Sequence, residues 1–194
     1  MKNIGLFFGS FNPIHNGHLI IASSIINLKI VDEIWFIVSP QNPLKDENTL
    51  LDFNHRYNMI KLAIDGIPKF LVSDIETTLP IPSYTYQTIQ KLKQDYIDYT
   101  FHIIMGQDCI NGIYKWKNFE EILINKIIIY PRNKYPLIFH HDEHNLSDYP
   151  EFPIIDISST IIRKLIQENK IYKYLIPNCI YEYIRLNNLY KLEN

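Results

Sequence analysis

The feature that most constrains this chain is a regular alternation between short apolar runs and longer segments with helical periodicity. The apolar runs are five or six residues long, rich in Ile, Val or Phe, and bounded by Gly, Pro, Ser or Asp. Buried parallel strands usually have this composition. We predict six strands, at residues 4–8, 33–38, 70–74, 100–105, 126–130 and 153–157.

Helical segments lie between these runs. The apolar spacing predicts helices over residues 17–28, 53–64 and 85–94, and two further helices over residues 159–169 and 177–188. Strands separated by helices of this length form βαβ crossovers. We therefore predict an α/β fold with a doubly wound parallel sheet and a small C-terminal helical part.

The domain organisation follows from length and continuity. We expect residues 1–194 to form a single domain, with the helices after about residue 158 packed on it. Residues 131–150 contain several prolines and no periodicity, so we expect a long surface loop there. Nothing in the sequence resembles a repeat or a low-complexity linker.

Composition excludes several classes of function. The chain has 19 Lys and Arg against 21 Asp and Glu, a formal charge of −2, so a large basic field for nucleic acid is absent. No apolar stretch approaches the roughly 20 residues that span a bilayer. Residues 1–8 carry one basic side chain and no cleavage site, and are predicted as a strand instead of a signal peptide. Cys109 and Cys179 are far apart, which favours a reducing compartment, the cytoplasm.

The loop after the first predicted strand has the strongest chemical signature, GSFNPIHNGH at residues 9–18. In open α/β sheets, ligands bind outside the carboxyl ends of strands, and a helix N-terminus attracts anions. His15 and His18 are three residues apart, so a helix starting there would direct both imidazoles at one volume. Such a pair suits a phosphate whose charge grows in a transition state. A metal pair or a purely structural pair are the alternatives, although the loop has no carboxylate or Cys to complete a metal site.

A second strand-to-helix corner is ISSTIIR at residues 157–163. Ser158 or Ser159 can cap the helix, and Arg163 lies one turn further along. An arginine there can hold phosphate oxygens through charge-assisted hydrogen bonds of about 1.5–3 kcal/mol each. Taken alone, the same pattern is also typical of a plain helix start.

Further polar and aromatic residues follow the other predicted strands. Gly106 permits close backbone approach, and Asp108 is suited either to ribose hydroxyls or to capping a helix. Trp116 is either a core residue or a flat surface for an aromatic ligand. Residues 82–86 (PSYTY) offer hydroxyls and amides at a helix start, which suits a carboxylate.

Charged residues in the loops are less specific. Lys45 and Arg132 are candidate phosphate ligands, but an exposed lysine is usually only solvated. Residues 140–144 (HHDEH) could bind a metal by composition. Because no second ligand cluster accompanies them, a solvated surface loop is favoured.

The two corner motifs together resemble a known family. The GSFNPIHNGH loop resembles the (H/T)xGH signature of the nucleotidyltransferase superfamily, and ISSTIIR matches its ISSTxxR motif at every defined position. Within the superfamily, the chain is similar almost from end to end to the nicotinate-mononucleotide adenylyltransferases of bacteria. Asn12 stands where many members have Asp, and Arg56 resembles a family arginine whose role is left open.

This resemblance implies a Rossmann-like nucleotidyltransferase fold and a reaction of NAD biosynthesis. ATP and nicotinate mononucleotide would give nicotinate adenine dinucleotide (deamido-NAD) and pyrophosphate, with Mg²⁺ accompanying ATP and no metal site in the protein. The implied catalytic residues are His15, His18 and Arg163. The implied ATP-binding residues are Gly9, Ser10, Phe11, His15, His18, Gly106, Asp108, Ile157, Ser158, Ser159 and Arg163. The implied mononucleotide-binding residues are Asn12, Lys45, Tyr84, Thr85, Trp116 and Arg132.

Other functions remain open at this point. A nicotinamide-mononucleotide adenylyltransferase differs in substrate by one group. Phosphopantetheine adenylyltransferases are usually shorter and carry Thr where His15 stands, and a class I aminoacyl-tRNA synthetase would need a lysine-rich second motif that is missing. A non-catalytic nucleotide-binding module on the same scaffold is a further alternative. The expected partners are the two nucleotides, without nucleic acid or membrane, and a homo-oligomer is compatible with the sequence.

Overall fold

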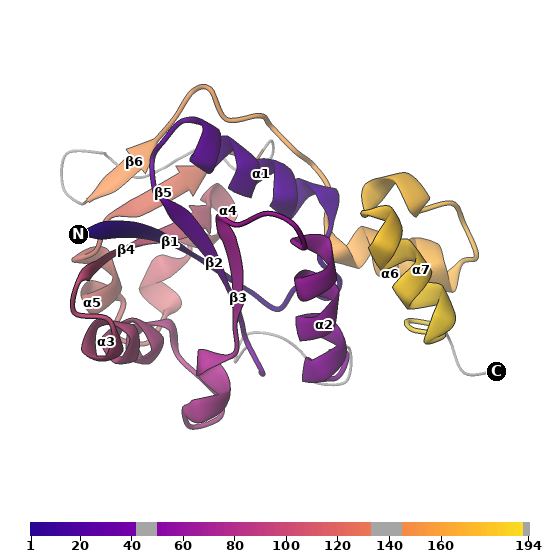
Figure 1. Cartoon of the computed structure of the whole chain (residues 1–194), viewed down its shortest axis with the longest axis horizontal. Helices are drawn as coiled ribbons and strands as arrows, with labels where there is room; N and C mark the ends of the chain where they lie inside the picture. The colour runs from indigo at the N-terminus through magenta and orange to yellow at the C-terminus, as the bar shows by residue number, and fades with distance from the viewer. Residues whose placement is uncertain (42–49, 133–144, 192–194) are drawn as a thin grey trace.

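The computed structural model describes residues 1–41, 50–132 and 145–191. In these parts of the chain, six strands form one parallel sheet in the order β3-β2-β1-β4-β5-β6 (Figure 1). The strands are β1 (Lys2–Gly9), β2 (Glu33–Val38), β3 (Phe70–Ser73), β4 (Tyr99–Gly106), β5 (Ile127–Tyr130) and β6 (Leu146–Asp148). The predicted doubly wound parallel sheet is confirmed.

Both faces of the sheet are covered, which explains why its central strands are apolar runs. Within β1, Ile4 and Leu6 belong to one core and Phe7 to the core on the opposite face. Leu6 pairs with Trp35 on β2 and with Ile103 on β4, so β1 lies in the middle of the sheet.

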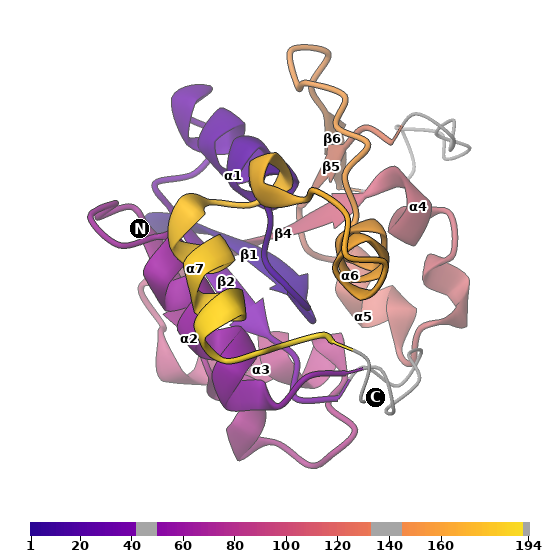
Figure 2. The ribbon, with the colours of Figure 1, turned by 90° about the vertical axis from the view of Figure 1, so that its right-hand side faces the viewer.

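The helices form the two outer layers (Figures 1 and 2). One core contains residues of α1 (Asn16–Asn27), α2 (Phe53–Ala63), α6 (Ser159–Gln167) and α7 (Asn178–Leu186). The other contains residues of α3 (Thr85–Asp95), α4 (Gln107–Ile110) and α5 (Phe119–Leu123). In the described parts of the chain, the remaining helical segments are short 3₁₀ turns, η2 (Ile75–Thr78), η3 (Ile113–Lys115) and η5 (Lys173–Leu175).

All five predicted helices are confirmed, with ends that differ by at most two residues. The C-terminal helices α6 and α7 contribute buried isoleucines to the α1–α2 core, and α7 lies alongside α2 (Figure 2). The short helices α4 and α5 had not been predicted, because four or five residues carry too little periodicity for such a prediction.

The sixth predicted strand was wrong. Residues 153–157 form no strand, and the sheet ends instead with β6, inside the segment 131–150 that was expected to be only loop. Leu146 of β6 is buried and pairs with Ile127 of β5. Ser147 and Asp148 are polar, so this edge strand lacks the apolar run on which the prediction depended.

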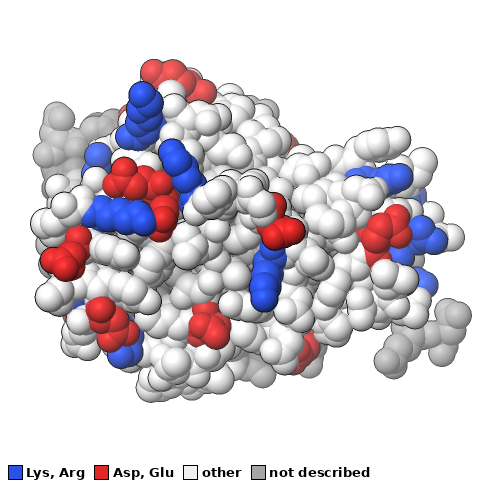
Figure 3. Space-filling view, viewed as in Figure 1, with Lys and Arg blue, Asp and Glu red and all other residues white. Residues whose placement is uncertain are grey.

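The surface carries no obvious single-sign region on the face shown in Figure 3. Lys and Arg side chains are interspersed there with Asp and Glu, in agreement with the net charge of −2. Among the described residues, no helix has the length and apolar character required to cross a membrane.

Candidate active site

The site lies where the strand order reverses. β1 lies between β2 and β4. From β1 the chain continues to β2 and β3 on one side of the sheet, whereas from β4 it continues to β5 and β6 on the other side. In doubly wound folds, the crevice at the carboxyl ends of such a strand pair is the usual ligand position. The loop after β1 leads into α1, and β4 leads directly into α4.

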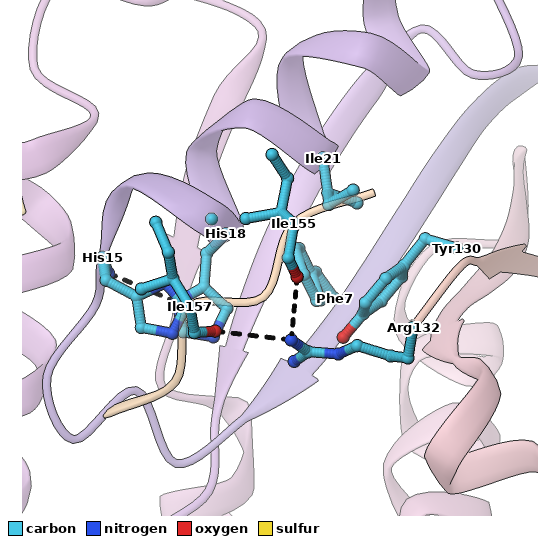
Figure 4. Close-up of a pocket in the computed structure, with 9 residues that line it drawn as sticks. Phe7, His15, His18, Ile21, Tyr130, Arg132, Ile155 and Ile157 are labelled. Carbon is cyan, nitrogen blue, oxygen red and sulfur yellow. Dashed lines mark hydrogen bonds between the residues drawn. The ribbon is translucent and has the colours of Figure 1, made fainter. Parts of the chain in front are cut away.

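Two histidines occupy the N-terminus of α1 (Figure 4). His15 is the N-cap residue, with extended backbone, and His18 lies in the first turn. Their rings stack with centroids 3.7 Å apart and planes 24° from parallel, and the His15 main-chain N–H donates to His18 Nδ1 at 3.3 Å. The spacing therefore brings both imidazoles together, as predicted. We call the group formed by His15, His18, Tyr130 and Arg132 the histidine corner.

The electrostatic state of His15 follows from its surroundings. Burial, followed by the positive charge of Arg132, lowers the pKa of His15 to about 3. The imidazole is therefore neutral at pH 7. Its Nδ1 atom is buried and has no hydrogen-bond partner. A buried polar atom without a partner is unfavourable for stability, and such atoms often mark functional sites.

Arg132 reaches the histidine corner from the end of β5 (Figure 4). Its Nη1 donates to the carbonyl oxygens of Ile155 and Ile157, both at 3.3 Å, and its Nε lies 4.0 Å from Asp108 Oδ1. Arg132 had been expected among the mononucleotide ligands. Instead it lines the small cavity of the histidine corner and does not line a second, larger cavity beside the end of β1.

The second motif contacts the first loop. Ser158 caps α6, its Oγ accepting from the Ile161 N–H at 3.3 Å. Ser159 Oγ donates to the Pro13 carbonyl oxygen at 2.8 Å. Arg163 Nη1 donates to the Asn12 carbonyl oxygen, also at 2.8 Å. Two segments about 150 residues apart in the sequence, with separations of 146 and 151 residues, are thereby joined at one corner.

Arg56 stabilises the loop after β1 through hydrogen bonds to main-chain carbonyl oxygens. The sequence alone left this role open. Only 1% of the residue is exposed, and its guanidinium donates to four main-chain carbonyl oxygens. The acceptors, at 2.7–2.9 Å, belong to Ser10, Ser39, Pro40 and Leu51. Burial lowers the pKa of Arg56 to about 10, so the side chain remains charged at neutral pH. Its planar fork of donors suits several fixed carbonyls at once.

Close packing fixes the conformation of the first loop. A Cβ atom at Gly9 would lie 2.9 Å from the ring of Phe11, so this position requires glycine. Phe11 has a positive φ of 45°, and its ring meets His18 edge to face at 5.0 Å. Asn12 is buried, and its Oδ1 accepts from the Leu51 N–H at 3.4 Å. Asn12 lines neither the small cavity of the histidine corner nor the larger cavity.

A larger cavity, of about 390 Å³, lies beside the end of β1. It is lined by Phe8, Gly9, Ser10, Ser39, Glu76, Ser83, Tyr84, Thr85, Cys109, Lys115, Trp116, Lys117 and Ile122. Three of the residues predicted to bind the mononucleotide, Tyr84, Thr85 and Trp116, are among them. Gly9 and Ser10, which were expected in the ATP site, line this cavity as well.

The larger cavity has a positive rim. Tyr84 is the N-cap residue of α3, so the unpaired N–H groups of the first helical turn lie at its edge. Lys115 and Lys117 are exposed beside Trp116. The Lys117 ammonium lies 4.5 Å from the centre of the Tyr84 ring. These groups can hold an anionic aromatic ligand.

The remaining predicted residues are placed as follows. Gly106 precedes α4, where any Cβ atom would collide with Asp108 Oδ1, and Asp108 itself is exposed. Lys45 and residues 140–144 lie outside the described residues. Among the residues that the structure does describe, no group of three His, Cys, Asp or Glu could hold a metal ion.

Glu76 was not identified from the sequence, and the role of Arg56 was left open. Glu76 is buried in the wall of the larger cavity, within a stretch that has no distinctive motif. Arg56 shares the buried face of α2 with Met59 and Ile60. An arginine at helical spacing from apolar residues was a usable signal that it is buried and hydrogen-bonded.

Comparison with known proteins finds matches over most of the chain. The model of the cytidylyltransferase-like family matches residues 6–165. A probable nicotinate-nucleotide adenylyltransferase of Flavobacterium johnsoniae is 45% identical over 190 residues, which cover 97% of this chain and 98% of the relative. The corresponding protein of Flavobacterium psychrophilum is 43% identical with the same coverage.

A solved structure is similar over nearly its whole length. The nicotinic acid mononucleotide adenylyltransferase of Plasmodium falciparum, complexed with NaAD, superposes with a TM-score of 0.82. The sequence identity is 27%, and 98% of each chain is covered.

Proposed function

We propose roles for individual residues from one premise: the chain belongs to the nicotinate-nucleotide adenylyltransferases, within the cytidylyltransferase-like family. It is thus a nucleotidyltransferase of NAD biosynthesis. It transfers the adenylyl group of ATP to nicotinate mononucleotide, giving nicotinate adenine dinucleotide and pyrophosphate. The 5′-phosphate of the mononucleotide attacks the α-phosphorus in line, and the bond to the β-phosphate oxygen breaks. Because this phosphate is already anionic at pH 7, no general base is required.

The observation that carries the residue assignment is the stacked pair of imidazoles at the start of α1, beside a cavity of nucleoside size. His18 and the first amides of α1 hold the α-phosphate, and neutral His15 donates one further hydrogen bond. These donors absorb the charge that develops in the transition state. Arg163 and Arg132, which approach the loop from α6 and β5, hold the β- and γ-phosphates.

The larger cavity binds the mononucleotide. The nicotinate carboxylate accepts from the free N–H groups at Tyr84 and Thr85, and the pyridine ring stacks on Trp116. Lys115 and Lys117 add positive charge at the rim. Gly106 and Asp108 lie beside Arg132, where a carboxylate suits the ribose of ATP. With these assignments, the site holds the two anionic substrates, ATP and nicotinate mononucleotide, in contact. This positioning is the main contribution to catalysis.

Mg²⁺ belongs to the proposal as a companion of ATP. The described residues contain no cluster of metal ligands, so the donor set fits an ion held mainly by phosphate oxygens and water. When bound with ATP, Mg²⁺ would neutralise part of the charge on the polyphosphate. A cytoplasmic location is also part of the proposal, favoured because Cys109 and Cys179 are far apart in the sequence and form no disulfide with each other.

The test is pyrophosphate release from ATP with each candidate acceptor. We expect Mg²⁺-dependent release with nicotinate mononucleotide, and a lower kcat/KM with nicotinamide mononucleotide. A higher kcat/KM with nicotinamide mononucleotide would identify the amide as the substrate. A preference for phosphopantetheine would contradict the assignment of the larger cavity. Binding of ATP without release, whatever the acceptor, would indicate a non-catalytic module.

A further inference from the structure

One buried carboxylate in the larger cavity is not used by this mechanism. Glu76 is 3% exposed and lies in η2, the turn that follows β3. It lines the cavity together with Ser39, Ser83 and Tyr84. Because a buried carboxylate is costly unless it is hydrogen-bonded, its partners indicate its purpose.

Both carboxylate oxygens of Glu76 accept hydrogen bonds from hydroxyl groups. Ser83 Oγ donates to Oε2 at 2.6 Å, and Thr88 Oγ1 donates to Oε1 at 2.9 Å. Burial raises the pKa of Glu76, whereas these bonds, with one from Ser39, favour the ionised form. Ser83 and Thr88 are themselves buried, at 5% and 0% exposed.

These partners enclose the start of α3. Ser83 directly precedes the N-cap residue Tyr84, and Thr88 lies one turn into the helix. Ser39 follows β2, where its carbonyl also accepts from Arg56. One carboxylate therefore connects the end of β2, the turn after β3 and both sides of the helix start that faces the cavity.

We propose that Glu76 is a positioning residue of the mononucleotide site, which fixes the first turn of α3 and thereby sets the preference for an acid over an amide substrate. The amides of that turn recognise a carboxylate only if they converge on it, and convergence requires a fixed helix start. The inference rests on the proposed function of the larger cavity.

The charge of Glu76 opposes this preference, which makes the proposal testable. A negative charge near the cavity disfavours an anionic ligand, so an effect of charge alone predicts that neutralising Glu76 strengthens binding of the acid. Positioning predicts the reverse. The acid-to-amide ratio of kcat/KM therefore moves in opposite directions under the two explanations.

The experiment compares four full-length proteins: the wild type, Glu76→Gln, Thr88→Val and Asp74→Asn. Glu76→Gln keeps the shape but cannot accept both hydroxyl hydrogens. Thr88→Val removes one arm of the network at a fully buried position that does not line the cavity. Asp74→Asn removes the same charge from an exposed position two residues away and is the matched control.

For Glu76→Gln, we expect the KM of nicotinate mononucleotide to rise about tenfold and the acid-to-amide ratio to fall by a similar factor. For Thr88→Val, we expect a smaller rise in the same KM, about threefold. The KM of ATP should stay within about twofold of wild type in both variants, and Asp74→Asn should match the wild type. If Glu76→Gln does not fold, the KM values of Thr88→Val decide whether the proposal holds.

Three outcomes in these variants would overturn the proposal. They are a higher acid-to-amide ratio of kcat/KM, an unchanged KM for nicotinate mononucleotide, and equal changes in the KM of the mononucleotide and the KM of ATP. The wild-type assay keeps this result separate from the proposed function. If the wild type itself preferred the amide, the substrate assignment would fail, whereas the split between the two KM values would still test whether Glu76 positions the cavity wall.

Discussion

The histidine corner and the larger cavity both lie at the carboxyl end of β1, but they differ in the volume that is open to a ligand. Phe7 points to the histidine corner, while Phe8 lines the larger cavity, so the two regions lie on opposite faces of the sheet. Their volumes are about 10 Å³ and about 390 Å³. The first has room for about one water molecule, and the second is of nucleoside size.

The polar groups of the two regions are also used differently. In the histidine corner they contact one another: the imidazoles stack, and Arg132 donates to two main-chain carbonyls. In the larger cavity, the start of α3 and two lysines face the open volume. Under the proposed assignment of the two regions, the mononucleotide would meet a preformed surface, whereas a triphosphate would have to replace contacts within the protein. Substitutions should therefore separate the two regions kinetically.

The largest effect is expected for His18→Ala. Loss of a donor to the α-phosphate should lower kcat by about 10²–10³-fold, as loss of one such donor does in other enzymes. The KM of nicotinate mononucleotide should change little, because the larger cavity is intact. Steady-state pyrophosphate release measures both constants.

The control for this variant is His55→Gln. His55 lies on α2, where its Nδ1 is 3.0 Å from the Tyr183 hydroxyl, outside both regions. It should retain nearly wild-type kcat. A folded His18→Ala protein with near-normal kcat would remove the histidine corner from the mechanism.

Arg132→Gln tests to which region this arginine belongs. A charged hydrogen-bond donor to phosphate contributes about 1.5–3 kcal/mol, so its loss should lower kcat/KM for ATP by about 10- to 100-fold. The KM of the mononucleotide should remain within about twofold. If the mononucleotide KM rises instead, the original expectation from the sequence holds, and the comparison between the regions fails at this residue. Lys126→Gln, at an exposed position before β5, is the control.

The position of Arg132 illustrates what the sequence could and could not predict. The strands that were predicted correctly are short apolar runs, and the two corner motifs are local, so each can be recognised from a few consecutive residues. The role of Arg132 depends on the carbonyls of Ile155 and Ile157, over 20 residues away. Arg56 likewise reaches Ser10, 46 residues away. Such partners are determined by tertiary packing.

The same reason explains the strand that was missed. β6 has three residues, of which only Leu146 is buried, and it exists because β5 offers an edge to pair with. Residues 153–157 carry a stronger apolar pattern, yet Arg132 binds carbonyls of this segment. Glu76 was missed in a similar way, because its neighbours in the sequence give no sign of the hydroxyl groups that surround it in space.

The closed packing of the histidine corner also predicts a pH effect on stability. Burial and Arg132 lower the pKa of His15 from 6.5 to about 3, so between these values the unfolded state binds more protons. Stability should therefore fall as the pH falls below about 6.5. Between pH 7 and pH 5, His15 should account for a loss of about 2 kcal/mol in the free energy of unfolding.

Urea unfolding at the two pH values measures this effect. The loss on going from pH 7 to pH 5 should be about 2 kcal/mol smaller for His15→Asn than for the wild type. His102, whose pKa burial also lowers, contributes in the same direction in both proteins and cancels in the difference. Equal losses in the two proteins would show that His15 is more accessible to protons than its 2% exposure implies.

A smaller effect than those above is expected in the preformed region, for Trp116→Ala. Stacking of a base on an aromatic side chain contributes about 1–3 kcal/mol, so the KM of nicotinate mononucleotide should rise about tenfold. The KM of ATP should not follow, and Trp116→Phe should recover most of the loss. Tyr114→Ala is the matched control, because Tyr114 is 59% exposed and does not line the larger cavity. If both KM values rise together in Trp116→Ala, the two regions do not act as separate halves of the site.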